Sequence, residues 1–149
     1  FVVTKRNETS LSGKYAFYTT DNKMIGEPYT FSMIGTEVFF DFLIADIENS
    51  KVVFPYLIFS DKIAPDNGIN IAKQYDVDAF PGIFSKTASN KFNKELLRVY
   101  QDICKGSKLE EHYGNAVHDT SELGKFIVGQ EYRILIHTKG GIEIVPSDN

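Results

Sequence analysis

A single segment of this chain has the periodicity of a long helix, and strand-like segments lie on both sides of it. Ser89 is a residue type that caps the N-terminus of a helix, and Gly106 is one that ends a helix. Between them, apolar side chains recur at helical spacing at Phe92, Leu96, Val99, Tyr100, Ile103 and Cys104. The spacing predicts one long helix over about 89–105.

The apolar residues before this helix alternate as they do in strands. Tyr29, Phe31 and Met33 share one face of such a segment. Residues 37–45 are nearly all apolar, which predicts a strand covered on both faces. In the next apolar run, Pro55 has no N–H to donate to a ladder, so we expect a sheet edge or a bulge there.

The residues after the helix return to strand character. Side chains alternate over residues 131–138, and a Lys-Gly-Gly turn at 139–141 leads into a second apolar run at 142–145. This pattern predicts a C-terminal hairpin. A short helix is expected near 69–75. With strands first, then helices, then strands, the 149 residues predict one α+β domain, 1–149, built mainly on antiparallel sheet.

Composition excludes several classes of function. Sixteen basic and twenty acidic residues give a net charge of -4, which suits a soluble domain and provides no overall field for nucleic acid. We therefore expect no nucleic-acid partner. One cysteine excludes an internal disulfide framework. No phosphate-binding or dinucleotide-binding glycine motif follows a strand, so we also expect no cofactor.

The densest group of chemically reactive side chains comprises Glu110, Glu111, His112, His118 and Asp119. Histidines beside carboxylates are typical of metal sites and of general bases. These residues predict a small hydrolase or metal-dependent enzyme using His112, His118 and Asp119, with Glu111 as a further candidate. On one helix the two histidines would be about 240° apart and could not share a face. The alternative interpretation is a solvated loop that happens to hold two of the three histidines.

Basic side chains follow the polar side of the predicted helix. Lys91, Lys94 and Arg98 could dock on phosphates or on an anionic surface, although Glu95 and Asp102 dilute the positive charge. A solvated outer face is the usual role of such a pattern. The only thiol, that of Cys104, falls on the apolar stripe near the end of the helix. The helix dipole disfavours a thiolate there, so we expect Cys104 to pack in the core.

Residues 71–84 contain a helix-like segment, a turn and Pro81 before further apolar residues. This stretch resembles the region around the substrate-side proline of thioredoxin-like proteins. The resemblance implies a fold of that class without redox activity, since disulfide exchange needs a C-x-x-C pair and this chain has one cysteine. The segments before it are typical of a hairpin, so our prediction of an α+β fold does not rest on this resemblance.

The sequence begins with Phe1 and not with methionine, and its first three residues are apolar. A removed signal peptide or membrane anchor would produce this start, and would be the route to any membrane association. A piece cut from a longer chain in any compartment would also produce it. Asn7-Glu8-Thr9 is a glycosylation sequon, meaningful in a eukaryotic secretory protein. We therefore expect a non-enzymatic, extracytoplasmic (periplasmic or secreted) domain whose partner is another protein. An intracellular inhibitor or immunity-type protein is the remaining alternative, because acidity steers such domains to basic partners.

Overall fold

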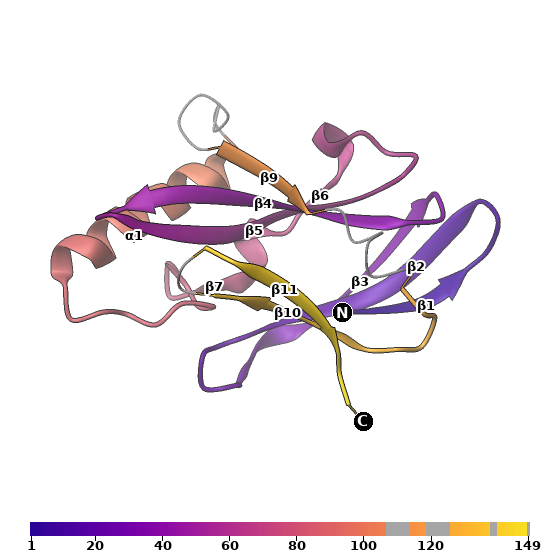
Figure 1. The fold of residues 1–149 in the computed structure, drawn as a ribbon, viewed down its shortest axis with the longest axis horizontal. Helices are drawn as coiled ribbons and strands as arrows, with labels where there is room; N and C mark the ends of the chain where they lie inside the picture. The colour runs from indigo at the N-terminus through magenta and orange to yellow at the C-terminus, as the bar shows by residue number, and fades with distance from the viewer. Residues whose placement is uncertain (107–113, 119–125, 138–139, 149) are drawn as a thin grey trace.

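A computed structural model describes residues 1–106, 114–118, 126–137 and 140–148, and its architecture is α+β, as predicted (Figure 1). The first five strands are β1 (Val2–Arg6), β2 (Ser10–Tyr18), β3 (Met24–Ile34), β4 (Val38–Ile47) and β5 (Ser50–Ser60). Short elements follow: the 3-10 turn η1 (Pro65–Asn67), β6 (Ile69–Asn70), the 3-10 turn η2 (Ala72–Tyr75), β7 (Asp76–Val77) and β8 (Phe80–Pro81). The helix α1 (Asn90–Lys105) and strands β9 (Gly114–His118), β10 (Tyr132–Ile136) and β11 (Ile142–Pro146) complete the described chain.

The strands form four antiparallel sheets. The N-terminal sheet has the order β1-β2-β3, the central sheet has the order β6-β5-β4-β9, and β10-β11 and β7-β8 are two-stranded. We call β10-β11 the C-terminal hairpin. A bridge between Val2 and Glu131 joins this hairpin to β1, and the Phe1 nitrogen donates to the Tyr132 carbonyl at 3.0 Å. The hairpin therefore continues the N-terminal sheet beyond β1.

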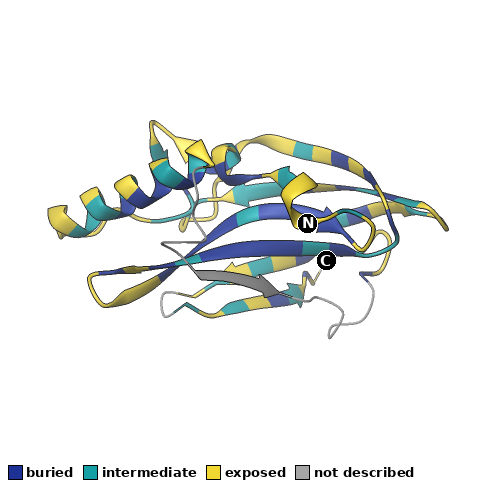
Figure 2. Cartoon of the chain, turned by 90° about the horizontal axis from the view of Figure 1, so that it is seen from above, coloured by how far each residue is buried: buried dark blue, intermediate teal, exposed yellow. Residues whose placement is uncertain are grey.

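Strand β4 separates two hydrophobic cores. One set of its side chains joins the core toward the N-terminal sheet and the hairpin: Val38, Phe40 and Phe42. The other set joins the core toward α1 and η2: Leu43, Ala45 and Ile47. The central sheet thus lies between a helical layer and a second β layer, and Figure 2 shows its two long strands buried over most of their length. The prediction of a strand covered on both faces over 37–45 is confirmed.

The apolar start of the sequence belongs to the core between the two β layers. The Phe1 ring lies 5.0 Å from the Phe40 ring and 4.9 Å from the Phe126 ring, measured between centroids. Val3 is fully buried. Core packing therefore accounts for the apolar character of these residues, whatever precedes them in a longer chain. Their apolar character is thus no argument for or against a signal peptide.

The long helix has the predicted ends. The Ser89 hydroxyl accepts a hydrogen bond from the Phe92 N–H at 3.2 Å, and Gly106 ends the helix in the left-handed conformation, with φ of 65°. The buried side chains of α1 belong to the predicted stripe: Leu96, Val99, Tyr100 and Ile103. Within the described ranges, no helix combines the length and the apolar composition that crossing a membrane requires.

Pro55 lies at a bulge, as its missing N–H predicted. Asp41 is opposite Leu57 and Phe42 is opposite Pro55, so Tyr56 is the extra residue of β5. The Pro55 carbonyl accepts a hydrogen bond from the Tyr75 hydroxyl at 2.8 Å. Among the described residues, β6 pairs with β5 at Leu57 and Ile58, directly beyond the bulge.

The short helix predicted near 69–75 is present as the 3-10 turn η2, and its first two predicted residues form β6 instead. Two contacts explain the difference. The Ile71 N–H donates to the Tyr56 carbonyl at 2.8 Å, and the Ala72 N–H donates to the Asn70 side-chain oxygen at 2.9 Å. The first bond ties the segment to β5, and the second is a local turn within the segment. Four residues remain for a helical turn.

Candidate functional site

The C-terminal hairpin has one buried face and one outer face. Its five cross-strand pairs run from Tyr132 opposite Pro146 to Ile136 opposite Ile142. The predicted alternation of side chains is confirmed in β10, because Tyr132, Ile134 and Ile136 contribute to the core. The outer face carries Arg133, Leu135, Glu143 and Val145.

The outer face of the hairpin combines an apolar centre with charges around it. Leu135 keeps 39% of its surface exposed, and it lies directly opposite Glu143. Near the turn, the His137 imidazole lies 3.2 Å from the Glu143 carboxylate. Arg133, two pairs further from the turn than Leu135, is exposed. An exposed leucine flanked by both signs of charge resembles the mixed composition of protein–protein interfaces.

The outer edge of β11 presents main-chain groups for pairing. The His137 N–H donates to the Gly141 carbonyl at 2.8 Å, and the Ser147 N–H donates to the Glu131 carbonyl at 2.9 Å. Odd-numbered residues therefore bond across the hairpin, so the main chain of Ile142 and Ile144 faces away from β10. Among the residues that the structure describes, none pairs with these outward N–H and C=O groups.

The outer edge of the N-terminal sheet differs from that of β11. Strand β3 contains Pro28, which lacks an N–H, and its register with β2 is interrupted between Tyr15 and Phe17. Gly26, in the same stretch, has a φ of 65°. Proline and bulges are the usual devices that keep an edge strand from pairing with another chain. The pairing edge of β11 is thus the more open of the two.

The basic residues proposed for binding lie on the exposed face of α1, with acidic partners beside most of them. Arg98 lies 2.6 Å from the Glu95 carboxylate and 3.5 Å from that of Asp102. This ion pair lowers the pKa of the Glu95 carboxyl. Lys91 lies 3.5 Å from the Glu48 carboxylate.

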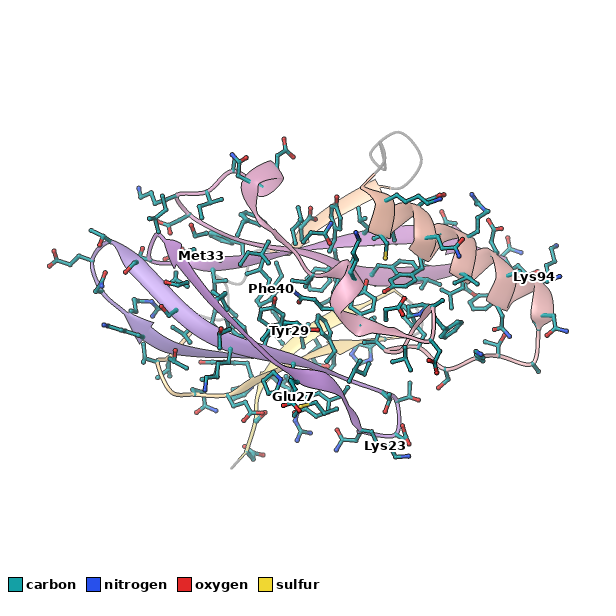
Figure 3. All side chains as sticks on the ribbon, turned by 180° about the vertical axis from the view of Figure 1, so that it is seen from behind. Lys23, Glu27, Tyr29, Met33, Phe40 and Lys94 are labelled. Carbon is teal, nitrogen blue, oxygen red and sulfur yellow. The ribbon has the colours of Figure 1, made fainter. Side chains whose placement is uncertain are left out.

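Lys94 is exposed, near the end of the molecule where α1 begins (Figure 3). The acidic neighbours of Lys91 and Arg98 offset the positive charge that an anion would meet on this face.

Most of the predicted catalytic group lies outside the described residues, namely Glu111, His112 and Asp119. His118 is the last residue of β9, where its backbone is opposite Phe40 of β4. In the part of the chain that the structure describes, no three His, Cys, Asp or Glu side chains gather as metal ligands would. The enzymatic hypothesis based on these residues stays a prediction.

The only thiol packs as expected from its place on the apolar stripe. Cys104 is half-buried against the core between α1 and the central sheet, and this burial raises the pKa of its thiol. The segment that resembles the proline region of thioredoxin-like proteins forms η2 and the small β7-β8 hairpin, with Pro81 in β8. The surrounding sheets are antiparallel, so this part of the fold does not follow the thioredoxin pattern.

Comparison with known proteins gives this chain no relative, because no protein-family model, no curated protein and no solved structure matches it.

Sequence reasoning located the hairpin but missed its open edge. Alternation and the Gly-Gly turn identified the two strands. Whether an edge is open depends on which strands lie beside it, and no local pattern records this.

Proposed function

We propose that this chain is a non-enzymatic protein-binding domain that contacts its partner through the C-terminal hairpin. The observation that carries the proposal is the open edge of β11 at Ile142 and Ile144, next to the exposed Leu135. Addition of an extended segment to an exposed strand edge is a recurring mode of peptide recognition. Main-chain hydrogen bonds then supply affinity, and the neighbouring side chains supply specificity.

The outer face of the hairpin supports a particular arrangement of the partner. An antiparallel segment beside β11 would bond to the outward groups of Ile142 and Ile144 and would lie close to Val145. Arg133 and Glu143 present opposite charges on the same face, and such charges favour one orientation of the partner over the other. We include in the proposal a location outside the cytoplasm, which fractionation of host cells tests separately.

Site-specific crosslinking tests the binding surface. A photo-crosslinking amino acid replaces Leu135 in one variant and Thr30 in the control, because Thr30 is exposed on the outer face of the N-terminal sheet. In host extract, position 135 is expected to give one defined crosslinked protein, and position 30 is expected to give none. Val145→Lys in the position-135 variant should reduce the product strongly, because the long charged side chain obstructs the hairpin face.

Equal products from positions 135 and 30 would contradict the proposed surface. An undiminished product in the Val145→Lys variant would do the same. Thr30→Lys is the matched control for added charge, and it should leave the product from position 135 unchanged.

A further inference from the structure

The turn between β1 and β2 consists of Asn7, Glu8 and Thr9, and all three residues are exposed. The Asn7 N–H donates to the Ser10 carbonyl at 2.9 Å and closes the turn. Asn7-Glu8-Thr9 has the form N-x-[ST], and no other asparagine of the 149-residue sequence is followed two positions later by serine or threonine. The chain therefore offers one acceptor sequence for an N-linked glycan.

The side chain of Asn7 is held by one of its two ends. Its oxygen accepts hydrogen bonds from the Thr9 N–H at 2.9 Å and from the Ser10 N–H at 2.8 Å. The hydroxyls of the same two residues lie at 3.2 and 3.1 Å. A main-chain N–H can only donate a hydrogen bond. The Asn7 atom that accepts from the two N–H groups must therefore be the oxygen Oδ1 and not the nitrogen Nδ2.

The assignment of Oδ1 leaves the amide nitrogen Nδ2 as the free end of Asn7. Among the described residues, no group is hydrogen-bonded to Nδ2. Figure 1 shows the β1–β2 turn at the opposite end of the molecule from α1. A large substituent on Nδ2 can therefore extend into solvent while the Oδ1 bonds keep the turn closed.

We propose that Nδ2 of Asn7 carries an N-linked oligosaccharide when the chain passes through a secretory pathway that makes this modification. The co-reactant is an oligosaccharide on a polyprenyl diphosphate. Nδ2 loses one proton, which passes to solvent, and forms a bond to C1 of the first sugar. The bond from C1 to the diphosphate oxygen breaks, and the lipid diphosphate leaves. The biological relevance of this site rests on the proposed location outside the cytoplasm.

Secretion from yeast behind a heterologous signal peptide tests the site. The secreted wild-type chain is expected to show a mass increase that peptide-N-glycosidase removes, leaving aspartate at position 7. Thr9→Ala should abolish the modification, and Thr9→Ser should retain it. Asn7→Asp is the matched control, because its carboxylate can accept the same two N–H bonds but has no nitrogen to modify.

The folded state provides the second readout. Glycosylated protein and enzymatically deglycosylated protein are expected to melt at the same temperature, since the glycan replaces no contact of Asn7. A folded, secreted wild-type chain with the same mass as Thr9→Ala would overturn the proposal. A clearly lower melting temperature of the glycosylated form would contradict the expectation that the Oδ1 bonds keep the turn closed. Because secretion is imposed, failure here is distinguishable from failure of the native location or of hairpin binding.

Discussion

The hydroxyl of Tyr75 fixes η2 against the bulge of β5. Tyr75 is fully buried, and its hydroxyl donates to the Pro55 carbonyl at 2.8 Å. Its ring centroid lies 5.0 Å from that of Phe17 and 5.5 Å from that of Tyr100. Tyr75→Phe therefore keeps the aromatic packing and removes one hydrogen-bond donor, which makes it a clean test of this contact.

Loss of this donor is expected to lower the free energy of unfolding by about 2 kcal/mol. A buried carbonyl that loses its donor costs roughly 1–3 kcal/mol. For a slope of roughly 2 kcal/mol/M in urea, the unfolding midpoint should fall by about 1 M with an unchanged slope. Tyr18→Phe is the control: Tyr18 is 43% exposed, so its free energy of unfolding should change by less than about 0.5 kcal/mol.

Equilibrium urea unfolding followed by circular dichroism measures both variants. Equal unfolding midpoints for Tyr75→Phe and Tyr18→Phe would refute the reasoning. They would mean that the hydrogen bond from Tyr75 to Pro55 stabilises the fold no more than the hydroxyl of an exposed tyrosine does. A changed slope would instead indicate that the substitution alters the compactness of one state.

Three further predictions concern the backbone and the tyrosines. Gly13→Ala should lower the free energy of unfolding by about 2 kcal/mol in thermal denaturation, because the added methyl would lie 2.6 Å from the Phe31 ring; wild-type stability would show that this contact is absent in solution. Ala79 has a φ of 64°, so Ala79→Gly should raise stability by about 0.5–1 kcal/mol, and a loss would argue against the left-handed turn. Burial raises the pKa values of Tyr75 and Tyr100 above their ordinary value of 10.0, so the folded state holds these protons more tightly than the unfolded state. The resulting stabilisation is complete below pH 10 and is lost as the pH rises above it, and a flat stability profile between pH 9 and 11 would contradict this.

Those parts of the fold that depend on neighbouring residues in sequence were predictable. The helix α1 carries its own cap at Ser89, its own stop at Gly106 and a stripe at helical spacing. The period of two in β10 also separated the side chains that lie on its two faces. In both cases the signal and the structure lie within one element.

Those parts that depend on distant residues were not predictable. The hydrogen bond between the Phe1 nitrogen and Tyr132 joins positions 131 residues apart, and no local pattern identifies such a pair. For the same reason, the apolar start had an alternative explanation as the remnant of a leader. The first two residues of the predicted helix at 69–75 form strand β6, and Tyr56, on another element, accepts the Ile71 N–H directly after them.

The basic residues that the sequence offered as a binding site on α1 show the same division between local and distant information. Glu95 and Asp102, the acidic partners of Arg98, are visible in the sequence at helical spacing. Glu48, the partner of Lys91, lies in the turn between β4 and β5. The helix sequence alone therefore predicted more positive charge on this face than the folded chain presents. A charge pattern on one helix therefore predicts a binding face only after the neighbouring elements are known.

The layered architecture narrows where the described residues can meet a partner. Both faces of β4 are buried, so binding surfaces lie on the outer layers. On the N-terminal sheet, the Ser12 and Ser32 hydroxyls already bond to each other at 3.1 Å, and on α1 Arg98 is paired with carboxylates. Polar groups that are satisfied within the domain gain little from a partner, because binding only exchanges one hydrogen bond for another. The hairpin combines an exposed leucine with outward main-chain groups that no described residue pairs with, so a partner would provide hydrogen bonds that the described residues do not.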